Sequence, residues 1–318
     1  MSLRIGVDLG GTKIAARCLM PTGLFGPEFR VPTPRHDYAA TIKAIVELVG
    51  QASRVSVAPV EPYSGRGANP GGGFGVRVGV AIPGSEAPGG ALIQNANSTW
   101  LNGRPFRTDL EAALGLPVRL ANDADCFALS EATDGTARGA RTMVGLILGT
   151  GCGAGIVIEG RLLNGPRGTA GEWGHTPLPN PTADEQPGPM CWCGRRGCLE
   201  TWIAGPAIAR DHEQVTGESR DVTEIVSAAE ARDPAARATL HRHLHRTARG
   251  LAVLTNILDP DVIVIGGGLS NLPGFCDNLA TAIVPHIFAN DQRVRIIGPK
   301  WGDASGARGA AWLWPTEG

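Results

Sequence analysis

The sequence predicts an α/β fold in two lobes, on the basis of three observations. Strand-like and helix-like segments alternate along its 318 residues. Three strand-like segments run into glycine turns, near residues 10, 149 and 266. The apolar content of 42% is enough for substantial cores. Strand–glycine turns in three places are what two nucleotide-holding lobes would need.

The N-terminal part begins with a hairpin. Leu3–Leu9 and Thr12–Met20 are strand-like, and only two glycines separate them. Tyr38–Arg54 carries apolar residues at helical spacing. Residues 61–75 are so rich in glycine and proline that we expect a flexible surface loop. Val76–Ile82 is the next strand.

The remaining elements continue the alternation of strands and helices. In chain order they are a strand at Val118–Leu120, a helix from Asn122, a strand at Met143–Leu148, a helix at Thr239–Leu258, a strand at Val262–Ile265 and a helix at Ser305–Trp314. Acidic residues at positions 123 and 125 suit the first turn of the helix that starts near Asn122. No internal repeat is evident in the sequence.

The glycine turns have the chemistry of phosphate-binding loops. Backbone N–H groups that such turns leave free can surround phosphate oxygens. Asp8–Lys13 adds a carboxylate, a hydroxyl and a cation at one turn, which suits a magnesium-bound polyphosphate. A Walker A loop is excluded because no lysine follows a glycine, and residues 149–155 lack the dinucleotide-binding spacing. Each turn taken alone is more often only a turn.

A cysteine-rich segment predicts a zinc site. One histidine and three cysteines form a tetrahedral set: His175, Cys191, Cys193 and Cys198. Gly194 and Gly197 permit the positive φ angles that a chain needs to wrap an ion. Glu172 and Glu200 lie beside these ligands. The zinc is therefore either purely structural or also a clip that positions the two glutamates for a ligand.

Composition and charge exclude several classes of protein. A net charge of −1 gives no reason to expect nucleic acid or a membrane surface as a partner. No signal peptide and no membrane-spanning apolar run is evident. Seven cysteines, an odd number, favour reduced thiols and metal ligation over disulfides. We expect a cytoplasmic protein.

Taken in order, five motifs resemble those of the ROK sugar kinases, a family of the actin-like ATPase superfamily. They are Asp8–Lys13 and Leu148–Gly155 as phosphate loops, Ile265–Ser270 as adenosine loop, Ala121–Asp125 as catalytic segment, and Gly171–His175 with Cys191–Glu200 as zinc and sugar signature. The resemblance implies a two-lobed actin-like ATPase (ribonuclease H-like) fold with an inter-lobe cleft. The expected lobes are residues 1–118 with the C-terminal helix 303–318, and residues 119–302, which carry the zinc site.

Within this family the chain resembles bacterial fructokinases of the manno(fructo)kinase type. Four segments carry that resemblance: Arg30–Arg35, Asn95–Gly103, Gly171–His175 and Gly309–Pro315. It implies ATP-dependent phosphorylation of D-fructose to fructose 6-phosphate. The alternative is an N-acetylglucosamine kinase, whose branch shares Cys126–Glu131 and Ile265–Asn271, or a glucokinase or mannokinase. Residue 125 is Asp where the family more often has Asn.

The resemblance also assigns roles. Asp123 matches the catalytic position and would be the general base, although a first-turn acid also suits a helix dipole without catalysis. The sugar would be bound by Asn97, Asn122, Asp123, Glu172, His175 and Glu200. The nucleotide would be bound by Asp8, Gly10, Gly11, Thr12, Lys13, Thr150, Gly151, Gly153, Gly266, Gly267 and Gly268. Asp8 would hold Mg²⁺ through water, and Zn²⁺ would be structural. Asn97 is equally well explained as an ordinary loop residue.

Two functions of other classes compete with a kinase. The family's sugar-responsive repressors carry an N-terminal winged-helix domain, and a phosphate loop that begins at Asp8 leaves no room for one. A non-catalytic actin-like assembly protein would leave the zinc set and Asp123 without a purpose. We therefore expect a kinase whose partners are ATP and a small sugar, with a homodimer as its assembly.

Overall fold

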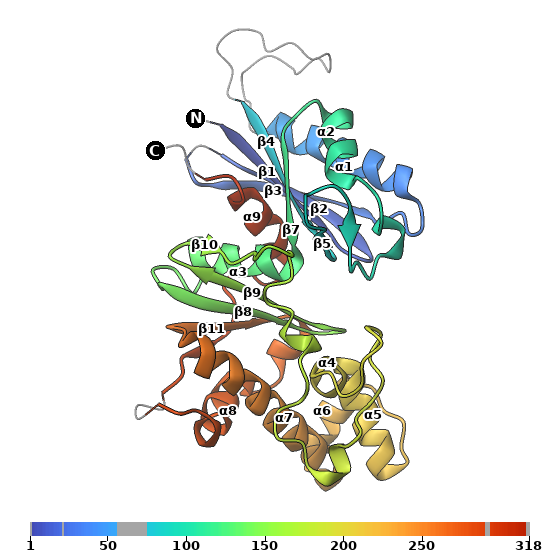
Figure 1. The fold of residues 1–318 in the computed structure, drawn as a ribbon, viewed down its shortest axis with the longest axis vertical. Coiled ribbons are helices and arrows are strands. Elements are labelled where there is room, and N and C mark those ends of the chain that lie inside the picture. Colours follow the sequence, from blue (N-terminus) through green and yellow to red (C-terminus); the bar gives the residue numbers. More distant parts are fainter. Residues whose placement is uncertain (1, 21, 56–74, 290–292, 316–318) are drawn as a thin grey trace. The chain divides into compact units, whose positions relative to one another are not determined.

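The computed structural model describes residues 2–20, 22–55, 75–289 and 293–315 (Figure 1). The chain divides into two compact units. The first contains Met1–Thr133, Leu162–Ala170 and Asp303–Gly318, and the second contains Asp134–Arg161 and Gly171–Gly302. The loop expected at residues 61–75 lies outside the described residues except for Gly75.

The first unit is built on a five-stranded sheet of order β3-β2-β1-β4-β7. Its strands are β1 (Leu3–Leu9), β2 (Lys13–Leu19), β3 (Phe25–Pro32), β4 (Val76–Ile82) and β7 (Val118–Asn122). The first three strands are antiparallel neighbours, whereas β4 and β7 run parallel to β1. The hairpin predicted at the N-terminus is present, with Leu9 opposite Ile14.

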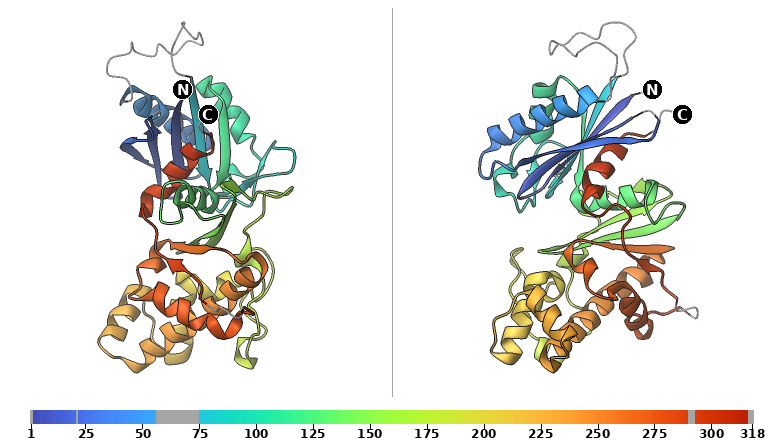
Figure 2. Two further views of the ribbon diagram at one scale, coloured as in Figure 1. Left: turned by 90° about the vertical axis from the view of Figure 1, so that its left-hand side faces the viewer. Right: turned by 180° about the vertical axis from the view of Figure 1, so that it is seen from behind.

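The helices of the first unit cover both faces of this sheet (Figure 2). They are α1 (Tyr38–Val55), α2 (Phe106–Leu114), α3 (Asp123–Thr133) and α9 (Ser305–Trp312), with the short elements β5 (Ser85–Glu86), β6 (Ile93–Gln94), η1 (Thr99–Leu101) and η6 (Gly302–Ala304). Because side chains alternate along a strand, Ile5 and Val7 face the main core while Gly6 faces α9. A Cβ at Gly6 would lie 1.8 Å from the carbonyl oxygen of Ala307, so only glycine lets α9 approach so closely.

The boundary between the units differs from the one expected at residue 119. The segment after that residue finishes β7 and forms α3, and both belong to the first unit. The physical reason is that β7 pairs with β4, while α3 packs on α9. A Cβ at Gly309 of α9 would lie 1.7 Å from the carbonyl oxygen of Cys126 in α3, which shows how close these helices are.

The second unit repeats the strand order of the first. Its sheet has the order β10-β9-β8-β11-β12. The strands are β8 (Thr142–Leu148), β9 (Cys152–Ile158), β10 (Arg161–Leu162), β11 (Val262–Gly266) and β12 (Ile296–Ile297). Again an antiparallel pair, β8 with β9, is extended on its other side by parallel strands. No repeat is evident in the sequence, because different side chains can form sheets of the same strand order.

Helices and short turns complete the second unit. The α-helices are α4 (Glu200–Ile203), α5 (Gly205–Thr216), α6 (Val222–Glu230), α7 (Pro234–Leu258) and α8 (Phe275–Ala282). The 3-10 turns are η2 (Trp173–His175), η3 (Ala183–Glu185), η4 (Gly268–Asn271) and η5 (Val284–His286). The core of this unit joins the second sheet to α7 and α8.

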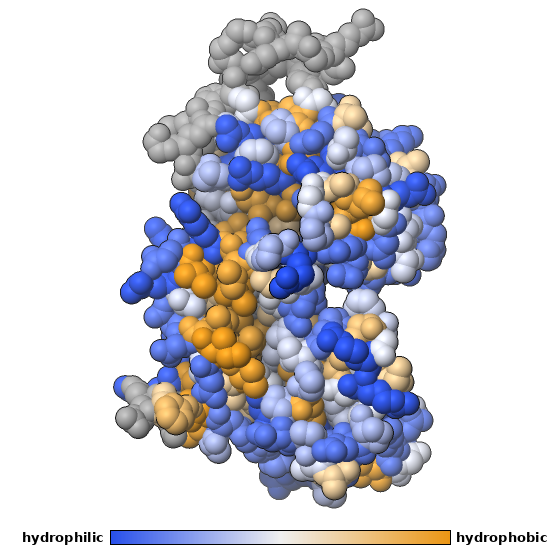
Figure 3. All heavy atoms as spheres, viewed as in Figure 1, coloured by the Kyte–Doolittle hydropathy of each residue, from blue (hydrophilic) through white to orange (hydrophobic). Residues whose placement is uncertain are grey.

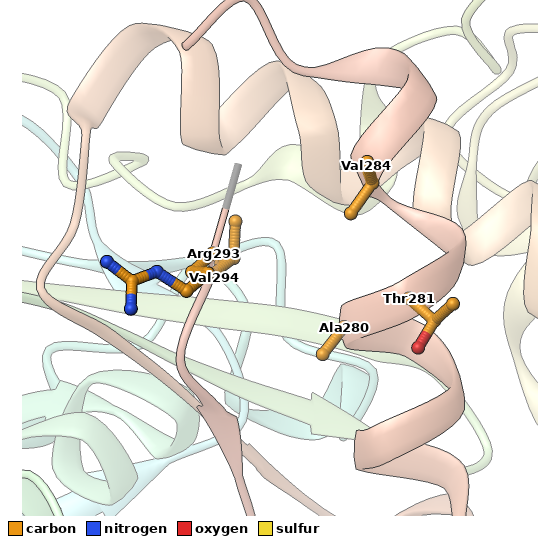
Figure 4. Close-up of a pocket in the computed structure, with 5 residues that line it drawn as sticks. All are labelled: Ala280, Thr281, Val284, Arg293 and Val294. Carbon is orange, nitrogen blue, oxygen red and sulfur yellow. The ribbon is translucent and has the colours of Figure 1, made fainter. Parts of the chain in front are cut away.

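Three surface properties complete the description. Within the described residues, no helix combines the length and apolar character that crossing a bilayer requires. On the face shown in Figure 3, apolar residues gather over the second sheet, and Ile158 at the end of β9 is one exposed apolar side chain. A surface pocket of about 430 Å³ is lined by α8, η5 and the segment before β12, and no candidate site residue lines it (Figure 4).

Candidate active site

The turn between β1 and β2 is anchored at both ends. The Gly10 amide donates to the Lys13 carbonyl at 3.0 Å, which closes the turn. Thr33 Oγ1 donates to the Gly10 carbonyl at 2.7 Å, and Arg35 Nε donates to the Gly11 carbonyl at 2.8 Å. Gly11 and Thr12 themselves are exposed. The first predicted phosphate loop is therefore a fixed turn that presents backbone to solvent.

Asp8 lies at the end of β1 in an environment that resists its ionisation. Burial and the nearby Asp123 raise the pKa of Asp8 to about 7, although Lys13 acts to lower it. Gly306 at the start of α9 lies directly against this carboxylate, because a Cβ there would be 2.4 Å from Asp8 Oδ2. Lys13 Nζ lies 3.3 Å from Asp303 Oδ2. A divalent cation would relieve the repulsion between the carboxylates of Asp8 and Asp123.

Asp123 lies where β7 ends and α3 begins, and its side chain is exposed. Its Oδ1 accepts from the Ala124 amide at 2.8 Å, as expected for a first-turn acid. The neighbouring Asn122 is tied to backbone at both ends of its amide. Its Nδ2 donates to the Gly84 carbonyl at 3.1 Å, and its Oδ1 accepts from the Ala124 amide at 2.9 Å. These bonds fix the backbone from which the Asp123 carboxylate projects.

Asn97 lies in an exposed turn of the first unit. The turn is held by Asn102, whose side chain accepts from the Ala96 amide and donates to the Ala96 carbonyl, both at 2.9 Å. Asn95 has a φ of 57°, a left-handed conformation that asparagine tolerates well. The geometry therefore leaves Asn97 available to solvent without assigning it a role.

In the second unit the four predicted zinc ligands converge. The ligand atoms of His175, Cys191, Cys193 and Cys198 all lie within 4.8 Å of one another. Cys191 Sγ is 3.5 Å from His175 Nδ1. Cys193 Sγ is 3.6 Å from Cys198 Sγ. Tetrahedral zinc, with bonds of about 2.0 Å to nitrogen and about 2.3 Å to sulfur, spaces its ligand atoms roughly 3.5–3.8 Å apart. The donor set thus fits Zn²⁺.

The loop around this cluster is shaped by glycines and backbone bonds. Gly194 and Gly197 have φ angles of 85° and 71°, as their places in the sequence predicted. The Cys191 amide donates to the Arg195 carbonyl at 2.8 Å. Burial raises the pKa of all three cysteines, that of Cys198 to about 12, but hydrogen bonds, chiefly from Arg195, lower the pKa of Cys193 to about 6. Cys193 is therefore the thiol of the cluster that ionises most readily before a metal binds.

Glu172, His175 and Glu200 lie together beside the cluster. The Nδ1 atom of His175 faces the cysteines, and its Nε2 atom lies 3.9 Å from Glu172 Oε2. Burial raises the pKa of Glu172, which His175 lowers and Glu200 raises further. Glu200 is held at both oxygens: Oε1 accepts from Trp192 Nε1 at 2.8 Å, and Oε2 accepts from the Cys152 amide at 2.9 Å. The two glutamates and the histidine form one polar group.

The two glycine turns of the second unit lie side by side. Because β8 and β11 are parallel neighbours, their carboxyl ends meet at the same edge of the sheet. Gly267 has a φ of 80°, and a Cβ there would lie 2.3 Å from the Leu148 carbonyl oxygen. A Cβ at Gly151 would lie 3.0 Å from Glu200 Oε2, so this turn also borders the glutamate group. Thr150, next to Gly151 in the first of these turns, is exposed, while Gly153 lies within β9.

Helix α7 supports the segment that carries the four predicted zinc ligands. Arg246 Nε donates to Glu185 Oε1 at 2.8 Å, and Arg249 Nη2 donates to both oxygens of Glu185 at 2.7 and 2.8 Å. Glu185 belongs to the stretch between the histidine and the first cysteine of the cluster. The buried His243 bonds through Nε2 with the carbonyl of Ile203, at the end of the helix that Glu200 begins. The loop therefore rests on a rigid, buried support.

The predicted residues thus form two groups, each described within its own unit. The first comprises Asp8, Gly10, Gly11, Thr12, Lys13, Asn97, Asn122 and Asp123, and the second comprises Thr150, Gly151, Gly153, Glu172, His175, Cys191, Cys193, Cys198, Glu200, Gly266, Gly267 and Gly268. Two neighbours of these groups carried no signal in the sequence: Asp303 and Gly306. Trp192 stands out by its place between two ligands, either as a shield of the site or as a plain hydrophobic cover. The sequence does not indicate its bond to Glu200, and the residue is 64% exposed.

Comparison with known proteins identifies the family. The ROK family model matches residues 67–317, which is more than half of the chain. The chain belongs to the ROK family. N-acetyl-D-glucosamine kinase of Salmonella paratyphi B is 37% identical over 318 residues, covering 98% of this chain and 99% of that protein.

Solved ROK structures agree with this assignment. The ROK hexokinase of Thermus thermophilus is 32% identical with a TM-score of 0.80, covering 97% of this chain and 96% of that one. A ROK glucokinase of Streptomyces griseus, solved with glucose and AMPPNP, is 28% identical with a TM-score of 0.76, covering 99% of this chain and 100% of that one. The predicted family and the predicted actin-like α/β fold are confirmed.

Proposed function

We propose that this ROK protein is an ATP-dependent sugar kinase. The observation that carries the proposal is the pair of carboxylates in the first unit. Asp123 is exposed at the end of β7, and Asp8 nearby has a pKa raised to about 7. A sugar hydroxyl needs a base to accept its proton, and a transferred phosphoryl group needs a cation, so one carboxylate serves each need.

In this proposal each residue has a role that follows from its chemistry. Asp123 accepts the proton of the attacking sugar hydroxyl. The oxygen of that hydroxyl bonds to the terminal phosphorus of ATP, and ADP leaves. Asp8 would hold Mg²⁺ through water, and this ion would neutralise phosphate charge when bound. The turns at Gly10–Lys13, Thr150–Gly151 and Gly266–Gly268 bind phosphate and nucleotide through backbone amides.

The sugar would be bound mainly by hydroxyl contacts. Glu172 and Glu200 accept from hydroxyls, while His175 offers Nε2 because Nδ1 faces the cysteines. Asn122 and Asn97 would also contact sugar hydroxyls. The structural Zn²⁺ would keep the group of His175 and the two glutamates rigid. The homodimer and the cytoplasmic location expected from the sequence stay predictions.

N-acetyl-D-glucosamine is the acceptor that the relatives support. The kinases that are 37% identical over 98% of this chain carry that name. D-fructose, which the resemblance to fructokinases implies, becomes the second candidate. The Asn95–Gly103 segment favours D-fructose, since the small polar residues around the exposed Asn97 offer little apolar surface for an acetyl methyl group. Transfer to the 6-hydroxyl is proposed in either case.

A coupled assay of ADP release decides between these proposals. The acceptors are N-acetylglucosamine, N-acetylmannosamine, fructose, mannose and glucose, each with Mg²⁺ and ATP. A kcat/KM for N-acetylglucosamine at least about tenfold above the others, or about 1.4 kcal/mol, supports the first candidate. The same margin for fructose establishes the second. If none of the five sugars accelerates ADP release, the kinase proposal is wrong.

A further inference from the structure

Trp192 is unusual because it is a large aromatic residue that is 64% exposed. It lies between two candidate zinc ligands, Cys191 and Cys193. Its indole Nε1 donates to Glu200 Oε1 at 2.8 Å. Its ring meets the ring of His175 edge to face, with centroids 4.9 Å apart and planes at 83°. The side chain is thus held in one place although solvent reaches most of it.

The bond from Trp192 completes the fixation of Glu200. The other oxygen of Glu200 accepts from the Cys152 amide at 2.9 Å. A carboxylate held by one donor on each oxygen cannot rotate without breaking a bond. Each oxygen still has a lone pair for a further donor. Glu200 is therefore oriented in advance and keeps the capacity to accept from a ligand.

We propose that Trp192 is a positioning residue that orients Glu200 for the sugar. The inference rests on the proposed function, in which Glu200 accepts from a sugar hydroxyl. A free glutamate side chain loses rotamer entropy when it binds, and a glutamate that is already fixed avoids this loss. The indole bonds this carboxylate through its edge and is largely exposed, so it would also give the sugar an apolar surface.

A simpler role would be to cover the metal cluster. The ring contact with His175 is consistent with that role, but the N–H bond to Glu200 is not explained by it. The two roles predict different losses. A cover would change zinc retention, whereas a positioning residue changes the KM for the sugar while zinc stays bound.

Three variants of the full-length enzyme separate these roles. Trp192→Phe keeps an aromatic ring and removes the N–H donor, whereas Trp192→Ala removes both. Met190→Ala is the matched control, because Met190 is an apolar residue of the same loop and is 55% exposed. Each variant is assayed with the best acceptor of the five-sugar panel, and its zinc content is measured by elemental analysis.

Trp192→Phe should raise the KM for the sugar about tenfold, with kcat and the KM for ATP within about twofold of wild type. Trp192→Ala should raise it further, and Met190→Ala should leave it unchanged. Zinc should stay at the wild-type level in all three. A normal sugar KM in Trp192→Phe, or a loss of zinc that accompanies the raised KM, overturns the inference. Wild-type enzyme that phosphorylates no sugar of the panel overturns the proposed function instead.

Discussion

The two units position their acidic pairs by different means. In the first unit Asp8 lies near the end of β1 and Asp123 follows β7, so the sheet itself sets the places of both carboxylates. In the second unit Glu172 precedes a single 3-10 turn and Glu200 begins a four-residue helix. Neither element is stable alone, and the cluster of one histidine and three cysteines connects them. With the proposed zinc bound, this cluster would be a metal clip that substitutes for a sheet where the chain has no regular structure.

The electrostatics of the two pairs are nevertheless alike. Burial and a second carboxylate raise the pKa of Asp8, and the same two causes raise the pKa of Glu172. A neighbouring basic residue opposes the shift in each case, Lys13 in the first unit and His175 in the second. Both pairs therefore favour whatever brings positive charge or hydrogen-bond donors to them. A magnesium-bound nucleotide and a sugar have those properties.

The largest effect is expected from breaking the clip. Cys193→Ser should lower the zinc content well below one ion per chain, because it removes one of the four predicted ligands. Sugar binding should weaken at least about tenfold, because the loop that carries Glu200 would lose its metal. Elemental analysis and sugar titration measure both losses. Cys276→Ser is the control, since Cys276 is a half-buried cysteine outside the cluster. A Cys193→Ser enzyme with full zinc would contradict the metal assignment.

A smaller effect is expected from the buried support of the clip. Burial raises the pKa of Glu185, but hydrogen bonds from Arg246 and Arg249 lower it to about 2, from an ordinary value of 4.5. Glu185→Gln should reduce the free energy of unfolding by about 2–3 kcal/mol at neutral pH. Glu185 stabilises the folded state above pH 4.5, and this contribution is lost as the pH falls towards 2.

The difference in unfolding free energy between Glu185→Gln and wild type should therefore be constant above about pH 4.5 and shrink below it. Denaturant titrations at a series of pH values measure it. Glu213→Gln, at an exposed position of α5, should change stability little at any of them. A difference that grows as the pH falls would mean that the arginines do not stabilise the ionised carboxylate.

The smallest effect is expected at Asp8, and its sign should be opposite. The folded-state pKa is raised to about 7, so ionised Asp8 weakens the fold as the pH rises from its ordinary value of 3.8 to about 7. In magnesium-free buffer at pH 8, Asp8→Asn should be at least as stable as wild type. Its half-saturating Mg²⁺ concentration should rise about tenfold, or about 1.4 kcal/mol. Lower stability combined with unchanged magnesium use would refute this role.

Local signals allowed much of the fold and of the candidate site to be predicted. The hairpin at the first glycine turn, the helix predicted from Asn122 and observed from Asp123, and the close approach of the predicted zinc ligands all depend on neighbouring residues or on a short loop. Glycine spacing correctly indicated positive φ angles at residues 194 and 197. For each of these features, the residues that determine the structure are those that the pattern contains.

Contacts between distant segments could not be predicted in this way. The approach of Gly306 to Asp8 joins the two ends of the chain. The neighbouring glycine turns at residues 149 and 268 follow from the pairing of β8 with β11, which no local pattern specifies. The bond between Trp192 and Glu200 depends on how the loop folds over itself. Such features require the tertiary structure, because hydrophobic pattern and turn chemistry do not encode which distant segments meet.

The division of labour between the two acidic pairs is tested most directly by one paired measurement. Sugar affinity and kcat are determined for Asp123→Asn and for Glu200→Gln with the best acceptor of the panel. Asp123→Asn should bind the sugar within about threefold of wild type while its kcat falls about a hundred- to ten-thousand-fold. Glu200→Gln should lose affinity about tenfold or more with a smaller loss in kcat. An Asp123→Asn enzyme that keeps roughly a tenth or more of the wild-type kcat would contradict the account.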